Sequence, residues 1–217
     1  MSRASVMPRE SNSTDSAICR TRVAVHRDLR VVAAIERVVF PDPWSHGMFV
    51  AHLRYGPPEM FLIAESPDGE LLGYALTRTV LDEAELLNIA VAPSARRRGI
   101  GVALLRAAME TCRAHGAEWM LLEVREANVA ARTLYERHGF TPVGRRAGYY
   151  HSPREDAIVM RAPLVDVTER PGVVPTRQEG LPEAGNKTMK RAERGLPVSA
   201  VSSILSSASQ LSRQETT

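Results

Sequence analysis

The chain has 217 residues, of which 44% are hydrophobic and 24% are charged, and its formal net charge is +3. This length and composition support one globular domain with tails. No stretch reaches the roughly 18 to 20 consecutive apolar residues of a membrane helix, and the first twenty residues lack the apolar core of a secretory signal, so we expect a cytoplasmic protein that does not bind membranes. Basic and acidic side chains are mixed evenly along the chain, which predicts no direct contact with nucleic acid.

The cysteine count and the composition of the two termini predict the absence of a metal site and the limits of the folded domain. Cys19 and Cys112 are the only cysteines, too few for a disulfide framework or a CxxC site, so we expect no metal. Residues 1–20 are polar and Ser-rich, and residues 164–217 are rich in Pro, Gly, Ser and charge, which predicts two disordered tails around a folded domain over residues 21–163. Alternatively, residues 196–211 could form a weak amphipathic helix on a partner.

Strand and helix patterns alternate along the folded part. Asp28 and Ser45 are predicted to cap the first two helices, and Gly116 and Gly139 to end the last two. The order β-α-α-β-β-β-α-β-α-β-β predicts an α/β fold, in which helices flank a mixed, mostly antiparallel central sheet with one parallel βαβ crossover between Val91 and Trp119. The predicted strands are residues 21–26, 60–65, 71–80, 85–91, 119–125, 141–145 and 157–161, and the predicted helices are residues 29–39, 46–55, 99–115 and 128–138.

A glycine-bearing loop follows the strand that ends at Val91 and leads directly into a helix. Its sequence is Ala-Pro-Ser-Ala-Arg-Arg-Arg-Gly-Ile-Gly-Val, residues 92–102. Glycines let the backbone approach a ligand closely, and the free N–H groups of a first helical turn favour anions, so a pyrophosphate would fit here. The spacing alone is weak, because Leu104 stands where a dinucleotide fingerprint has its third glycine. A plain tight turn with solvated arginines is the alternative.

The spacing Arg96-x-x-Gly99-x-Gly101 resembles the acetyl-CoA loop of the GNAT superfamily of N-acetyltransferases. The segments PWSHGMF, TVLDEAELLNIAVAP, LLEVREANVAARTLYERHGF and YYHSPREDAIVM are similar to those of bacterial ribosomal-protein-alanine N-acetyltransferases, the RimI type, over roughly residues 21–163. The resemblance implies the GNAT fold and acetyl-CoA as co-substrate. It implies that the backbone N–H groups of the loop hold the pyrophosphate and that the preceding strand pairs with the pantetheine arm. The residues concerned are Arg97, Arg98, Gly99, Ile100, Gly101 and Val102 for the pyrophosphate, and Ile89, Ala90 and Val91 for the arm.

Glu123 is a charged residue at the end of the apolar run Trp-Met-Leu-Leu, residues 119–122. Ionised carboxylates are costly to bury unless they are paired or used. The resemblance implies that Glu123 is the general base, often acting through water. The alternative is a strand-end glutamate in a structural salt bridge with Arg125 or Arg145.

Asn128 and Tyr135 are seven residues apart on one predicted helix and therefore share a face. The resemblance implies that Asn128 binds CoA and that Tyr135 protonates its sulfur. A core aromatic with a satisfied hydroxyl is the alternative for Tyr135. Neither cysteine is placed for a covalent acyl-enzyme, so we expect direct transfer.

The resemblance also implies the acceptor, the N-terminal α-amino group of a protein that begins with alanine, from the small ribosomal subunit. Asn88 and Tyr150 match positions near the acceptor site. The turn before Arg154 is shorter than in the family pattern, so lysine side chains, other N-termini or a small-molecule amine stay open as acceptors. A non-catalytic acetyl-CoA-binding module is the alternative from another class, and a pure sensor would need neither Glu123 nor Tyr135. We expect a monomer or weak dimer.

Overall fold

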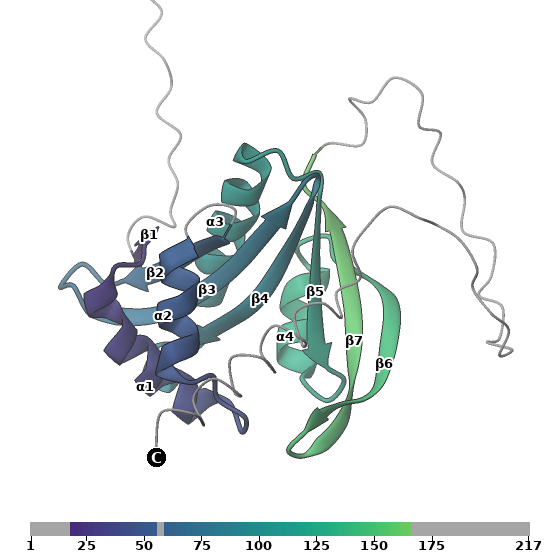
Figure 1. Ribbon diagram of the computed structural model, residues 1–217, viewed down its shortest axis with the longest axis horizontal. Helices are drawn as coiled ribbons and strands as arrows, with labels where there is room; N and C mark the ends of the chain where they lie inside the picture. The colour runs from purple at the N-terminus through teal and green to yellow at the C-terminus, as the bar shows by residue number, and fades with distance from the viewer. Residues whose placement is uncertain (1–17, 56–58, 166–217) are drawn as a thin grey trace, which may run out of the picture. The chain divides into compact units, whose positions relative to one another are not determined.

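The computed structural model describes residues 18–55 and 59–165 of the chain. The order of its helices and strands confirms the predicted order (Figure 1). Most of the predicted tails lies outside the described residues, so the domain limits stay a prediction. The elements are β1 Arg20–Val23, α1 Leu29–Val39, α2 His46–Tyr55, β2 Glu59–Glu65, β3 Leu71–Val80, β4 Glu83–Val91, α3 Ile100–Ala114, β5 Trp119–Arg125, α4 Val129–Glu136, β6 Thr141–His151 and β7 Arg154–Pro163, with 3-10 turns η2 His26–Asp28 and η3 Pro93–Ala95.

Seven strands form one sheet in the order β1-β2-β3-β4-β5-β7-β6. Every neighbouring pair is antiparallel except β4 and β5, which run parallel and are joined through α3. A parallel pair needs such a crossover, because its second strand must start again at the same edge. The predicted mixed sheet with one parallel crossover is confirmed.

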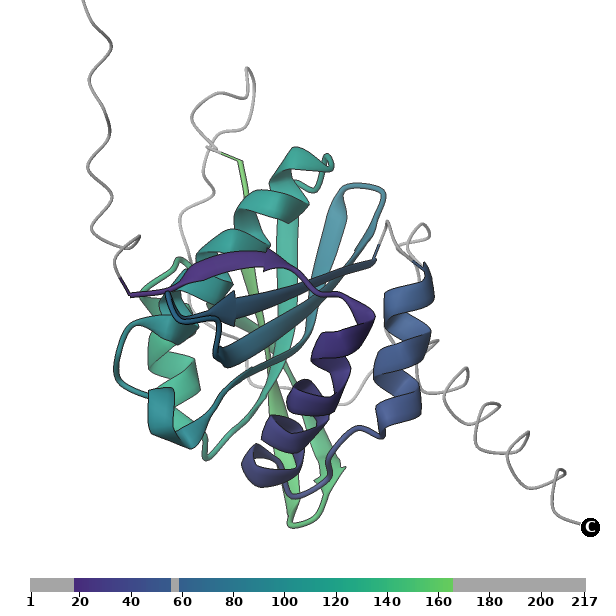
Figure 2. The same cartoon turned by 90° about the vertical axis from the view of Figure 1, so that its left-hand side faces the viewer.

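The helices lie on both faces of the sheet, α1 and α2 on one side and α3 and α4 on the other (Figure 2). Helix α1 buries Leu29, Val32 and Ile35 against one face. Helix α3 buries Leu104 and Leu105 against the other. Both helices carry apolar residues at three- and four-residue spacing, which explains why each has one buried face. In the described part of the chain, no helix has the length and apolar character that a membrane span requires.

The last hairpin is longer than predicted, because β6 and β7 extend to His151 and from Arg154. Its outer half carries no alternating apolar pattern, and Gly148 interrupts it with a φ of +60° at a register shift. The expected cap Ser45 is confirmed, since its Oγ accepts from the Met48 N–H at 3.3 Å. Asp28 precedes α1 as predicted but makes no capping hydrogen bond to it. Its carboxylate instead accepts from Arg22 and from the Val25 N–H, because η2 turns it back toward β1.

Candidate active site

The site is built around the point where β4 and β5 separate. The two strands pair from Glu83 with Trp119 to Leu86 with Leu122, and no further. Figure 1 shows them together at one end and apart at the other. Between β3 and β4 the register shifts after Leu86, so Leu87 is an extra residue in β4. Such a bulge bends its strand. The bend leaves the β5-facing main chain of the last part of β4 unpaired, which suits the pantetheine arm expected at Ile89, Ala90 and Val91.

The loop before α3 has the geometry that an anion requires. Gly99 adopts a left-handed φ of +81° and α3 begins at Ile100, without a side chain that caps its first turn. The first N–H groups of the helix therefore have no intrahelical acceptor. A Cβ at Gly101 would meet only Leu134 and Val91, at the ordinary distances of 3.6 and 3.7 Å. Packing alone therefore does not require glycine at this position. Arg97 and Arg98 are exposed beside it.

Glu123 is the first β5 residue beyond the last parallel pair. Its Oε1 lies 2.9 Å from Nε of Arg146 in an ion pair, and its side chain is 13% exposed. The salt bridge weighed from the sequence exists, but with Arg146, because Arg125 and Arg145 pair with other carboxylates. Among the described residues no donor is directed at Oε1 with hydrogen-bond geometry. Burial and then a hydrogen bond to Glu123 raise the pKa of Tyr149, so a tyrosine as well as an arginine contacts this carboxylate.

Two of the expected site residues are tyrosines, the buried Tyr135 on α4 and the half-buried Tyr150 on β6. Tyr135 is buried on α4 beside Phe140, with ring centroids 5.7 Å apart. Burial, and then the nearby Tyr150, raises the pKa of Tyr135 above its ordinary value, so its hydroxyl is protonated at neutral pH. Burial, and then the charge of Glu123, raises the pKa of Tyr150 from 10.0 to about 12. Tyr150 therefore lies near both proposed catalytic groups.

Asn128 has a structural task at the start of α4. Its Oδ1 accepts from the Ala131 N–H at 3.1 Å, which makes it the N-cap of the helix. Asn128 therefore begins the same short helix that carries Tyr135, as the spacing predicts.

Arg125 holds the turn between β6 and β7. It donates to the carbonyl oxygens of Ser152 at 3.0 Å and Pro153 at 3.1 Å, and to Glu155 at 3.2 Å. Its guanidinium lies 4.1 Å from the ring centroid of Tyr150. The sequence reasoning missed this role and treated Arg125 only as a possible partner of Glu123. Arg125 fixes one wall of the proposed acceptor site.

A buried carboxylate on α1, Glu36, was also missed. It is 1% exposed and accepts hydrogen bonds from the Trp44 N–H, the Tyr74 hydroxyl and the Asn88 amide. Burial raises the pKa of Glu36, while these donors oppose the shift. The signal in the sequence was a glutamate four residues after Val32, on the apolar face of the helix.

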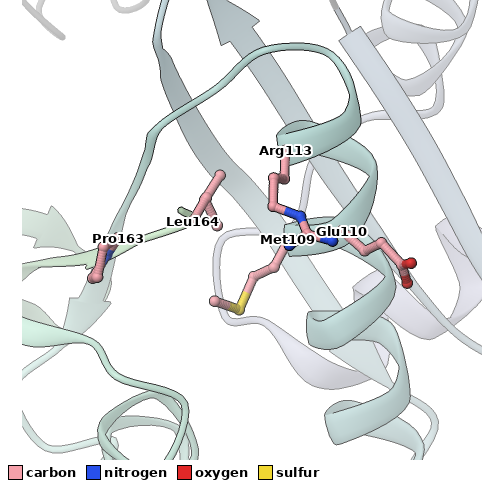
Figure 3. A pocket seen from close by; sticks show the side chains of 5 residues that line it. All are labelled: Met109, Glu110, Arg113, Pro163 and Leu164. Atoms are coloured by element: carbon pink, nitrogen blue, oxygen red, sulfur yellow. The ribbon is translucent and has the colours of Figure 1, made fainter. Parts of the chain in front are cut away.

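One hollow lies away from the separation, between the C-terminal half of α3 and the end of β7 (Figure 3). Its lining includes Glu110 and Arg113, and it adjoins the end of the sheet where β4 and β5 are paired. None of the proposed site residues lines it. Within the described ranges, no group of His, Cys, Asp and Glu side chains could hold a metal ion.

The sequence profile of the acetyltransferase (GNAT) family matches residues 29–140, more than half of the chain. The chain belongs to this family. A putative [ribosomal protein bS18]-alanine N-acetyltransferase of Bacillus subtilis is 37% identical over 145 residues, which are 65% of this chain and 95% of that protein. The GNAT fold and the acetyltransferase class predicted from the sequence are thereby confirmed.

Two solved structures of the family are similar to this one. The ribosomal-protein-S18-alanine N-acetyltransferase of Escherichia coli superposes with a TM-score of 0.64 at 34% identity, covering 72% of this chain and 100% of that one. A GNAT phosphinothricin acetyltransferase of Sinorhizobium meliloti, solved in complex with AcCoA, has a TM-score of 0.61 at 25% identity over 73% of this chain and 96% of that one. GNAT acetyltransferases use acetyl-CoA, in agreement with the expected co-substrate.

Proposed function

We propose that the protein transfers the acetyl group of acetyl-CoA to the N-terminal α-amino group of another protein, with the N-terminal alanine of a small-subunit ribosomal protein as acceptor. The names of the relatives in B. subtilis and E. coli support the acceptor. The observation that carries the chemistry is the position of Glu123, a largely buried carboxylate at the first β5 residue beyond the last pair between β4 and β5. We place the reaction in the cytoplasm, in a monomer or weak dimer that binds neither nucleic acid nor membrane.

In this proposal Glu123 is the general base. An α-amino group has a pKa of about 7.7 to 8.0, so much of it is protonated at neutral pH and cannot attack. The Glu123 carboxylate takes a proton from the amine, directly or through one water. The nitrogen lone pair then attacks the thioester carbon and forms the new C–N bond. The attacking nitrogen then carries a positive charge and loses its second proton to solvent through a water. When the tetrahedral intermediate collapses, the C–S bond breaks and the electron pair leaves on sulfur, and Glu123 returns its proton to solvent.

Tyr135 is the proposed general acid. Its hydroxyl carries a proton at neutral pH and can donate it once the sulfur gains charge. The hydroxyl then donates to the thiolate, CoA leaves as the thiol, and solvent returns the proton to the tyrosine. Gly99, Gly101 and the first N–H groups of α3 would bind the pyrophosphate, Asn128 Nδ2 would bind CoA, and Asn88 and Tyr150 would contact the acceptor.

A peptide panel tests the acceptor. We would incubate the protein with acetyl-CoA and peptides that differ only in the first residue, and include one peptide with a blocked N-terminus and a free lysine. Thiol release gives the rate, and mass spectrometry locates the acetyl group. We expect fastest transfer to N-terminal alanine. Equal transfer to lysine would contradict the proposed acceptor, and CoA binding without thiol release for any amine would indicate a non-catalytic module.

A further inference from the structure

The buried carboxylate of Glu36 joins three parts of the fold. On its Oε1 it accepts from the backbone N–H of Trp44, in the α1–α2 connection, at 2.9 Å. On its Oε2 it accepts from the Tyr74 hydroxyl of β3. The Asn88 side chain of β4 approaches both oxygens, with Nδ2 at 3.2 and 3.4 Å. Neither the expected pyrophosphate site nor the proposed acid and base accounts for this cluster.

These contacts fix which way the Asn88 amide faces. The Trp44 N–H is a donor by its chemistry. Tyr74 donates too, because burial and then the charge of Glu36 raise its pKa and keep the proton on its hydroxyl. Both oxygens of Glu36 therefore act as acceptors, and an amide side chain can meet them only with its NH₂ group. The carbonyl oxygen, Oδ1 of Asn88, is left facing away from Glu36.

The position of Asn88 gives this orientation a consequence. It lies two residues beyond Leu86, the last β4 residue that pairs with β5, and it shares a sheet face with Glu123. It is half-buried, and its Oδ1 accepts no hydrogen bond from the described residues. A fixed acceptor with no donor partner, beside the separation of the strands, is suited to an N–H group of a substrate.

We propose that Glu36 is a positioning residue that holds the Asn88 amide so that its Oδ1 accepts an N–H of the incoming amine. This inference rests on the proposed function, since it assigns the amine to the same site. The bond would orient the nitrogen lone pair while Glu123 takes the proton. It would also favour a free amine over an acceptor that has no N–H at its first residue.

Glu36→Gln tests the inference with little change in volume. The glutamine NH₂ group would face the donors of Tyr74 or Asn88, so the Asn88 amide is expected to turn and present NH₂ to the substrate. The readout is the ratio of two dissociation constants, for an Ala-peptide and for the same peptide with propionyl in place of alanine. A hydrogen bond to a charged group predicts that wild type prefers the amine by about 10-fold to 100-fold. Glu36→Gln should lose this preference and raise KM for the peptide more than it lowers kcat.

Tyr74→Phe is the matched control. It removes another donor to Glu36 and costs stability, but it leaves the Glu36 contact with Asn88 in place. It should keep the preference for the amine, and acetyl-CoA affinity should be unchanged in both variants. Asn88→Leu should lower the preference as far as Glu36→Gln does, and the double variant should show no further loss.

Three results would overturn the inference: an unchanged preference in Glu36→Gln, an unchanged preference in Asn88→Leu, or equal loss in Tyr74→Phe. Failure of the proposed function would look different. Wild type would then release no thiol with any N-terminal amine, before a variant is compared. Should Glu36→Gln not fold, the Asn88→Leu ratio still decides whether Oδ1 binds the amine, and an unchanged ratio there rejects the inference.

Discussion

The proposed reaction gives Glu123 and Tyr135 different roles, and the two residues are held by different elements. Glu123 stands on β5 where pairing with β4 ends, and Tyr135 is buried on α4. The ion pair with Arg146 does not by itself decide between a structural and a catalytic Glu123. The kcat of variants distinguishes a catalytic from a structural Glu123.

Glu123→Gln and Tyr135→Phe should each lower kcat by roughly 10² to 10⁴, which is the usual contribution of a positioned acid or base. Their acetyl-CoA dissociation constants should change little, because neither group holds the pyrophosphate. Steady-state kinetics and calorimetry measure the two quantities. Glu126→Gln, which changes a half-exposed carboxylate three residues along the chain, is the control and should stay near wild type. A normal kcat in Glu123→Gln would show that the carboxylate is structural.

Two substitutions at Gly101 distinguish an effect on ligand binding from an effect on folding. Gly101→Ala should fold normally, because the new Cβ meets only ordinary contacts at 3.6 and 3.7 Å. Gly101→Glu should abolish acetyl-CoA binding, since a side chain and a negative charge would enter the space of the pyrophosphate. Calorimetric titration of both variants measures this. An unchanged dissociation constant in Gly101→Glu would show that the pyrophosphate binds elsewhere.

At the scale of elements, the β6–β7 hairpin depends on a residue of another strand. Arg125 bonds to two carbonyl oxygens of the turn and to Glu155, and Glu155 in turn accepts from the Ala127 N–H at 2.6 Å. The hairpin turn and the connection from β5 to α4 are thus fixed together. Ser152 also donates its N–H to Asp42 of the α1–α2 connection at 3.2 Å.

Arg125→Met should lower the free energy of unfolding by about 2 kcal/mol, because it leaves the half-buried Glu155 carboxylate without its charged donor and removes the guanidinium from the Tyr150 ring. Arg145→Met is the matched control on the same hairpin. The Arg145 side chain is 58% exposed in its ion pairs with Glu126 and Asp156. Its replacement should therefore lower the free energy of unfolding by less than about 1 kcal/mol. Urea unfolding compares the two, and equal costs would show that the Arg125 contacts with the turn contribute little.

For the whole molecule, unfolding should depend on pH through the link between β1 and α1. Arg22 donates to Asp28 at 2.8 and 3.0 Å, and this bond is the main reason that the pKa of Asp28 lies below its ordinary value of 3.8. Because the pKa of Asp28 is lower in the folded than in the unfolded state, its carboxylate stabilises the fold at any pH above the unfolded-state pKa. That stability is lost as pH falls through the folded pKa.

Asp28→Asn should therefore be less stable than wild type by about 2 kcal/mol at pH 6 to 7, on the scale of a lost hydrogen bond to a charged group. The difference should shrink below about pH 4, where wild type loses the same charge. Urea unfolding at a series of pH values measures the gap between the two proteins. A gap that stays constant down to pH 2.5 would contradict this assignment of the acid sensitivity.

The sequence by itself determined the elements and the glycine-bearing loop before α3, because both depend on near neighbours in the chain. Apolar spacing marked α1 and α3, and glycine marked the left-handed residues Gly99, Gly116 and Gly139. The outer half of the β6–β7 hairpin was missed, since its stability comes from Arg125 and from pairing rather than from its own composition. The order of elements also predicted the single parallel crossover.

Only the tertiary structure decided which side chains meet. Glu36 contacts Tyr74 and Asn88, which lie 38 and 52 residues away along the chain, so no local pattern pairs them. Arg146 rather than Arg145 reaches Glu123, because side chains alternate between the faces of a strand and one step along β6 changes the face. The separation of β4 and β5 follows a bulge at Leu87 that only the pairing with β3 reveals. Long-range pairing and register are set by the packing of the whole sheet, and the site depends on both.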